Sequence, residues 1–104
     1  MAVGCNGARG EVRAALAGGE RTLCLTLGAL AEIESELGLT SVSELAGRMR
    51  ALSAADLIVV LAALLRGGGE QDLAGTLAAA AIDPYEAADA VGRAFAASAG
   101  APPA

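Results

Sequence analysis

Two segments near the start of the chain alternate apolar and polar residues, which is the period of a β-strand. The residues on one face of these segments are Val12, Ala14 and Leu16 in the first and Leu23, Leu25 and Leu27 in the second. Between them lies Ala17-Gly18-Gly19-Glu20, in which paired glycines supply the positive φ of a tight turn. We therefore expect a β-hairpin. Its leucine face has to pack on another layer, because an isolated hairpin is only marginally stable.

The pattern changes to helical spacing at residues 28–38. The apolar face of this helix is expected to consist of Leu30, Ile33 and Leu37. Gly38 stands in the position of a C-terminal glycine cap. We interpret Glu32 and Glu36, which lie outside the apolar face, as a solvated surface rather than an acid pair. Like charges at this spacing cost only ~0.2–0.5 kcal/mol when they are exposed.

Two serines mark the next helix starts. Ser41 with Glu44, and Ser53 with Asp56, have the spacing of a capping box, in which each side chain bonds the backbone N–H of the other residue. The first of these helices is expected to direct inward Val42, Leu45, Met49 and Leu52. The second continues as residues 57–65, which are apolar all round and therefore predict the centre of the core.

The segment after that central helix has weaker signals. Arg66 suits the C-terminal end of a helix, and Gly67-Gly68-Gly69 predicts a flexible joint. Residues 70–81 are rich in alanine and have few large side chains, so we expect a weakly held helix there. Its expected anchors are Leu73, Leu77 and the following Ile82.

A final helix start is clear at residue 83. Asp83 predicts an N-cap, Pro84 occupies the first helical position and Glu86 the third. The inward face is expected to present Tyr85, Ala88, Val91 and Phe95. We expect both aromatic residues of the chain to dock on the core through this face.

These patterns predict one α+β domain at residues 10–98, built as an N-terminal β-hairpin followed by four to five short helices packed around one core. Residues 1–9 are small, polar and aperiodic, and predict a flexible arm. Residues 99–104 contain two prolines and predict a disordered tail. A length of 104 residues leaves room for one core and for no second domain.

The charge balance is acidic, with Lys+Arg 7 against Asp+Glu 12 and a formal net charge of -5. All the basic residues are arginines, and they are scattered from Arg9 to Arg93 rather than clustered to neutralise phosphates. The longest apolar run, residues 57–65, is far shorter than the ~20 residues that span a bilayer. Residues 1–9 lack the basic and apolar regions of a secretory signal. We expect a cytoplasmic protein that binds neither nucleic acid nor membrane.

Candidate catalytic chemistry is sparse. Because the chain has no histidine, Cys5 and Cys24 cannot complete a four-ligand zinc site. We interpret Cys24 as a small apolar strand residue rather than a nucleophile, since no histidine or lysine exists to activate it. Gly67-Gly68-Gly69 lacks the Lys-Ser/Thr pair of a phosphate loop. We expect no enzymatic activity, no catalytic or metal-binding residue, and no cofactor.

Binding to another protein is the function that remains. A hairpin added to helices has an edge strand, which can pair with an incoming strand unless it is covered. We identify the first strand as the candidate edge and partner-binding surface, because Glu11, Arg13 and Glu20 place charge around it. The alternative is that these charges only keep the protein soluble.

The order of the segments resembles a known family. The resemblance is carried by Arg9-Gly10-Glu11-Val12, by Leu25-Thr26-Leu27-Gly28-Ala29-Leu30-Ala31-Glu32-Ile33-Glu34, and by Leu52-Ser53-Ala54-Ala55-Asp56-Leu57-Ile58 with the later Leu64-Leu65-Arg66-Gly67-Gly68. Over about residues 9–95, the chain is similar to the small tail protein of gene transfer agents. That family is classed with phage tail assembly chaperones, although some family labels call it a tail tube protein.

The resemblance implies a non-enzymatic function in building a siphophage-like tail. Chaperones of this class are thought to bind the tape-measure protein and to help tube subunits polymerise around it, so the implied partners are the tape-measure protein and other tail proteins. One alternative is a structural tail subunit that stays in the particle. Another is a helical adaptor unrelated to phage. No functional residue is transferable from the resemblance.

Overall fold

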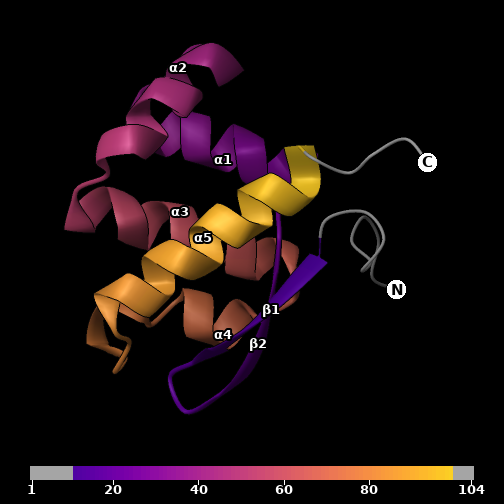
Figure 1. Ribbon diagram of the computed structural model, residues 1–104, viewed down its shortest axis with the longest axis vertical. Helices are drawn as coiled ribbons and strands as arrows, with labels where there is room; N and C mark the ends of the chain where they lie inside the picture. The colour runs from indigo at the N-terminus through magenta and orange to yellow at the C-terminus, as the bar shows by residue number, and fades with distance from the viewer. Residues whose placement is uncertain (1–10, 100–104) are drawn as a thin grey trace.

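The structure is a computed structural model and describes residues 11–99. It begins with a hairpin and continues with helices, so the α+β prediction is confirmed (Figure 1). The elements are β1 (Glu11–Leu16), β2 (Gly19–Cys24), α1 (Leu27–Leu37), α2 (Val42–Arg48), η1 (Met49–Ala51), α3 (Ala54–Gly67), α4 (Gln71–Ala74), η2 (Leu77–Ala79) and α5 (Pro84–Ala99). The predicted arm at 1–9 lies outside the described residues. So does the predicted tail except for Ala99, which ends α5.

The hairpin turns on two residues rather than on the four that the sequence predicted. Ala17 and Gly18 both have positive φ, 53° and 81°, as in the turn whose twist matches that of the flanking strands. Gly19 and Glu20, which were assigned to the turn, instead belong to β2, where Gly19 lies opposite Leu16. The tighter turn therefore lets β2 begin two residues earlier than predicted.

The second strand ends sooner than its alternation predicted. β2 stops at Cys24, and the Thr26 hydroxyl accepts a hydrogen bond of 3.0 Å from the Ala29 backbone N–H, which makes Thr26 the N-cap of α1. Leu27, expected on the buried strand face, is therefore the first residue of the helix and is 83% exposed. The C-terminal end of α1 agrees with the sequence, because Gly38 caps it at a φ of 71°.

Helix α3 is the centre of the core, as predicted. Its residues from Val60 to Leu65 are all buried, and β2, α1, α4 and α5 contact it from different sides. Figure 1 shows α5 crossing α3, with the hairpin beside both helices and α2 at the end of the molecule away from the hairpin turn. The first half of α3 differs from the prediction, because Leu57 and Val59 are only partly buried and Ile58 is 42% exposed.

The glycines after Arg66 form a close contact rather than the expected flexible joint. A Cβ on Gly67 would lie 2.2 Å from the Cys24 carbonyl oxygen, and one on Gly68 would lie 2.1 Å from the Thr22 carbonyl oxygen. Any side chain at either position would therefore push α3 away from the backbone of β2. Glycine is required here so that helix and strand can touch.

The two serine N-caps differ in the hydrogen bonds that they form. Ser53 and Asp56 form the complete capping box that the sequence predicted. Ser41 also caps its helix, accepting a 3.2 Å hydrogen bond from the Glu44 backbone N–H. The Glu44 carboxylate, however, accepts from the Thr40 backbone N–H at 2.7 Å and from the Thr40 hydroxyl at 3.0 Å. The prediction that Glu44 reaches back to Ser41 is wrong, because Thr40 offers two donors instead of one.

The weakly held helix predicted at residues 70–81 is divided into α4 and η2. Gly75 ends α4, and the Thr76 hydroxyl donates to the Asp72 carbonyl oxygen at 3.2 Å. Glycine and a hydroxyl that bonds its own backbone both weaken helix continuation. The anchors nevertheless serve as expected, since Leu73 and Leu77 are buried.

Helix α5 begins as predicted, with the Asp83 carboxylate accepting a 2.8 Å hydrogen bond from the Tyr85 backbone N–H. Its inward face is different from the one expected. The buried residues are Ala87, Ala90, Val91 and Ala94. Tyr85 is 85% exposed and Ala88 is exposed as well, while Phe95 is only partly buried. Small alanines allow α5 to lie close to β1 and α3, and this close packing leaves the bulky Tyr85 outside.

Candidate interaction surfaces

The described residues contain no obvious reaction centre. Among residues 11–99, no group of three or more His, Cys, Asp or Glu side chains is placed to hold a metal ion. No polar or charged side chain in the same part of the chain is buried. Two surface features stand out instead, the outer edge of the hairpin and an apolar groove between helices.

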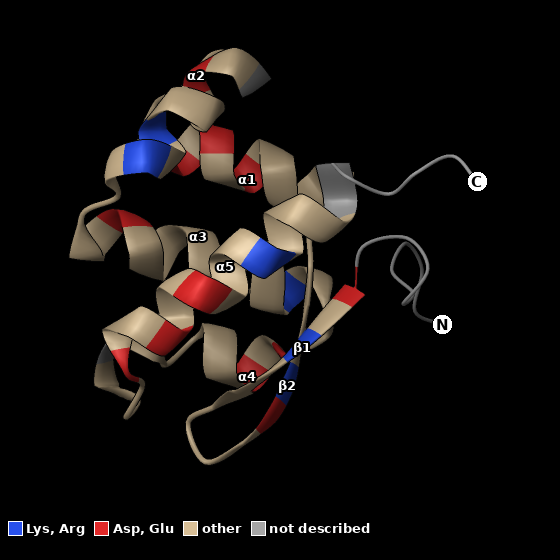
Figure 2. Ribbon diagram, viewed as in Figure 1, with Lys and Arg blue, Asp and Glu red and all other residues tan. Residues whose placement is uncertain are grey.

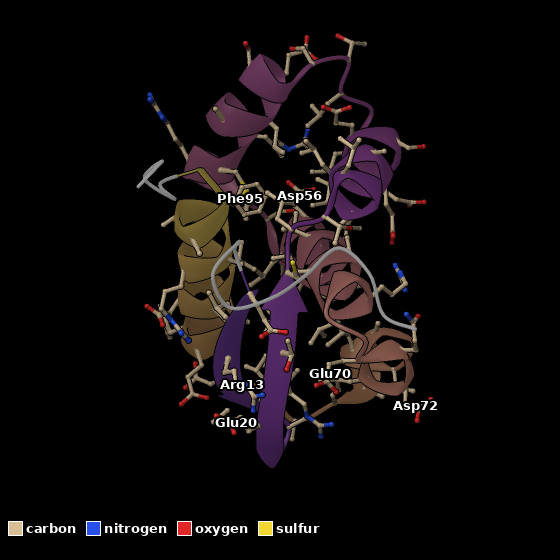
Figure 3. The ribbon with its side chains drawn as sticks, turned by 90° about the vertical axis from the view of Figure 1, so that its right-hand side faces the viewer. Arg13, Glu20, Asp56, Glu70, Asp72 and Phe95 are labelled. Atoms are coloured by element: carbon tan, nitrogen blue, oxygen red, sulfur yellow. The ribbon has the colours of Figure 1, made fainter. Side chains whose placement is uncertain are left out.

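The structure brings together two of the three residues expected at the hairpin edge. The Arg13 Nη1 atom lies 3.4 Å from the Glu20 Oε1 atom, and both side chains point outward near the turn (Figure 3). They are diagonal neighbours, since Arg13 lies opposite Thr22. Glu11 lies farther from the turn, opposite Cys24, and is partly exposed. With side chains 61% and 65% exposed, the Arg13–Glu20 pair contributes little to stability.

Both edges of the hairpin are partly covered by side chains from distant segments. On one edge, Arg93 of α5 donates from Nη1 to the Arg13 carbonyl oxygen at 3.0 Å. On the other, the Thr22 backbone N–H donates to the Glu70 carboxylate at 2.9 Å, and Figure 3 shows Glu70 beside the hairpin. Local sequence patterns do not reveal these contacts of Arg93 and Glu70, because each lies more than forty residues from the strand it covers.

The remaining open positions on β1 follow from the register. In an antiparallel pair every second residue turns its backbone groups away from the partner strand. The outward bonds at Arg13 and Thr22 identify one such pair, so Ala15, two residues along β1, also directs its N–H and C=O outward. Ala15 is exposed. A shallow hollow of about 350 Å³ lies beside it, lined by Ala14, Ala15, Tyr85, Glu86, Asp89 and Arg93.

The apolar groove lies at the other side of α5. Its volume is about 210 Å³, and its lining is entirely apolar: Ala54, Leu57, Ile58, Leu61, Leu77, Ala80, Ile82, Pro84 and Ala87. These residues come from the first half of α3, from η2 and the segment that follows it, and from the first turn of α5. The groove was not predicted, because an all-round apolar helix was expected to be covered on every side.

Ion pairs hold the helices around these surfaces. Arg48 binds both carboxylate oxygens of Asp56, at 2.9 and 3.1 Å, and so joins the end of α2 to the start of α3. Hydrogen bonding with Arg48 lowers the pKa of Asp56 and raises the pKa of Arg48. Glu32 similarly binds Arg66 and raises the pKa of that guanidinium. Glu32 is therefore more than the solvated charge expected from the sequence, because it links α1 to α3.

The fold and these surfaces define a small α+β protein whose accessible features suit contact with other proteins. Over residues 9–99 the chain matches the family described as phage tail tube protein, GTA-gp10. The chain belongs to this family, so the resemblance to the small tail protein of gene transfer agents is confirmed. No curated protein and no solved structure matches the chain.

Family membership places the chain among phage-type tail proteins, a structural rather than catalytic group, with other tail proteins as partners. The alternative of a helical adaptor unrelated to phage is set aside on this ground. Within the described residues, no helix is both long enough and apolar enough to cross a bilayer.

Proposed function

We propose that this protein is a non-enzymatic tail assembly chaperone that acts in the bacterial cytoplasm, binds the tape-measure protein and assists assembly of the tail tube. The observation that carries the proposal is the accessible apolar groove of α3, η2 and α5, in an otherwise acidic, well-capped domain. Such a groove suits reversible binding of an apolar helical client. A transient binder needs no further cofactor or catalytic residue.

The hairpin supports the same proposal. A tube subunit usually needs a sheet large enough to join neighbouring subunits in a closed ring of strands. The described residues contain a sheet of two strands, and side chains of the same chain already bond one outward group on each edge. We propose the β1 edge, with Glu11, Arg13 and Glu20, as a secondary contact surface for a tail partner.

A second candidate function is a structural tail subunit that is retained in the particle. The observation in its favour is the family description itself, which names a tail tube protein. In that case the β1 edge would pair with a neighbouring subunit, and Arg93 would have to release the Arg13 carbonyl oxygen.

The two functions are distinguished by co-expressing the chain with the tape-measure protein from the same locus. The complex is followed by size-exclusion chromatography with light scattering, and purified particles are analysed by mass spectrometry. A chaperone co-elutes with the tape-measure protein and is absent from particles. Retention in particles at ring-like stoichiometry, without a soluble complex, would refute the chaperone proposal and establish the structural subunit.

A further inference from the structure

The groove has the geometry of an unfilled helix-packing site. Its lining residues Ala54, Leu57, Ile58 and Leu61 stand at helical spacing i, i+3, i+4 and i+7 along α3. A stripe of this spacing is the face that one helix presents to another. The second half of α3 is surrounded by its own chain, whereas along this stripe Ala54 and Ile58 are exposed and Leu57 is only partly buried.

The size of the groove suits side chains inserted from a partner. A dry apolar cavity of about 150 Å³ holds a benzene ring, so the 210 Å³ groove has room for at least one large aliphatic or aromatic side chain. Further contacts are available from the exposed side of Ile58. An amphipathic helix can offer such side chains in a row, because residues at i and i+4 share one face.

The charge around the groove indicates which residues should flank the apolar face of that helix. The segments that supply its lining, residues 54–61 and 77–87, contain Asp56, Asp83 and Glu86 and no arginine or lysine. Arg48 balances Asp56, while Asp83, just before α5, and Glu86, in its first turn, are exposed. Figure 2 shows acidic residues along the N-terminal half of α5, ahead of its one arginine. A partner with Lys or Arg beside its apolar face is therefore complementary.

The same charges disfavour a second copy of this chain in the groove. The chain has a formal net charge of -5, so self-association through an acidic rim would bring like charges together. A partner with basic residues would instead be attracted by the same negative charge.

We propose that this groove is the docking site for an amphipathic helix of a tail partner, with aliphatic side chains that fill the groove and Lys or Arg at its flanks. The inference rests on the proposed chaperone function, in which the tape-measure protein supplies the helix. It adds the surface, the binding mode and the chemistry of the segment that is recognised.

The test titrates the full chain into overlapping synthetic peptides that cover the tape-measure protein, with fluorescence anisotropy as the readout. Peptides that bind should combine aliphatic residues at helical spacing with flanking Lys or Arg, and should bind more weakly as salt is raised. Ile58→Glu should weaken binding about tenfold or more, because it places a charge in the groove. The matched control Leu27→Glu changes another exposed apolar residue, on α1 and outside the groove, and should bind like the unmodified chain.

Two further variants guard against a folding artefact. Ala54→Phe fills the groove from its exposed end and should also weaken binding, while circular dichroism and thermal unfolding verify that each variant is folded. Glu86→Gln should weaken binding about two- to threefold at low salt, and Glu36→Gln on α1 should leave it unchanged.

The outcomes separate the two levels of the proposal. If the unmodified chain binds tape-measure peptides and folded Ile58→Glu and Ala54→Phe bind equally well, the groove assignment is overturned while the chaperone function stands. If binding is strongest to peptides with acidic flanks, the charge argument is overturned. If the unmodified chain binds neither the peptides nor the intact tape-measure protein, the chaperone function and the groove assignment both fail.

Discussion

Two glycines determine how closely the central helix α3 approaches the hairpin. Gly67 and Gly68 let the end of α3 touch the backbone of β2 at Cys24 and Thr22, where a Cβ atom would overlap a carbonyl oxygen. Gly92, in the middle of α5, has open space around its Cβ position. The same residue type is therefore required in one helix and dispensable in another.

Substitution of these glycines should have opposite effects. Gly68→Ala should lower the free energy of unfolding by about 1–3 kcal/mol, because the new methyl group forces the strand and helix apart. Gly92→Ala should raise it by roughly 0.5–1 kcal/mol, since alanine loses less backbone entropy in a helix. Urea unfolding followed by circular dichroism measures both. An unchanged midpoint for Gly68→Ala would show that the close approach does not exist in solution.

The Arg48–Asp56 pair should make stability depend on pH at the acidic end. Hydrogen bonding with Arg48 holds the pKa of Asp56 in the folded protein below its ordinary value near 3.9. The pair therefore stabilises the fold above about pH 4, and its contribution is lost as pH falls through the lowered pKa.

We expect Asp56→Asn to be less stable than the unmodified protein at pH 7 and to approach it in stability as the pH falls through the lowered pKa of Asp56. Thermal unfolding across this pH range measures the difference. Asp72→Asn, which removes an exposed carboxylate elsewhere, provides the control. A difference between Asp56→Asn and the unmodified protein that stays constant with pH would exclude this linkage.

Among the elements, the hairpin carries an identifiable local strain. Its two-residue turn places Ala17 at a φ of 53°, a left-handed conformation that costs an alanine roughly 1–2 kcal/mol. Asparagine followed by glycine is the preferred pair for this turn, and Gly18 is already in place.

Ala17→Asn should therefore stabilise the protein by about 0.5–1 kcal/mol. The control Ala15→Asn puts the same side chain into an exposed strand position, where asparagine is disfavoured, and should be neutral or destabilising. Differential scanning calorimetry of the two variants provides the comparison. If Ala17→Asn melts no higher than the unmodified chain, the turn differs from the one described.

Across the whole molecule, α3 is the central element, in contact with β2, α1, α4, η2 and α5. Leu64 is completely buried in it, whereas Leu27 on α1 is 83% exposed. Leu64→Ala should cost about 2–5 kcal/mol through lost burial and the cavity left behind. Leu27→Ala should change stability by less than about 0.5 kcal/mol.

Chemical denaturation with two probes, far-ultraviolet circular dichroism and hydrodynamic radius, tests this difference and whether the domain unfolds as one unit. Coincident transitions are expected for a single core. A small effect of Leu64→Ala would contradict the central position of α3.

Much of the local structure was determined by the sequence alone. The caps at Ser41, Ser53 and Gly38 and the helix start at Asp83 depend on groups a few residues apart. Alternation and helical spacing likewise report on neighbours along the chain, so the hairpin, the helices and the central position of α3 were predictable. The end of β2 was less predictable, because Thr26 caps α1. The partner of the Glu44 carboxylate was also less predictable, because Thr40 offers competing donors.

The tertiary structure determined which segments are neighbours, and therefore where the candidate surfaces lie. Arg93 and Glu70 cover the hairpin edges, and Gly67 and Gly68 contact β2, so both features join segments that are far apart in the sequence. The outward position of Tyr85 likewise depends on how α5 packs against distant segments. The apolar groove arose in the same way, because α5 packs through its alanines and stops short of covering the first half of α3. Periodicity identifies an apolar face, but only packing determines whether the chain itself covers that face or leaves it for a partner.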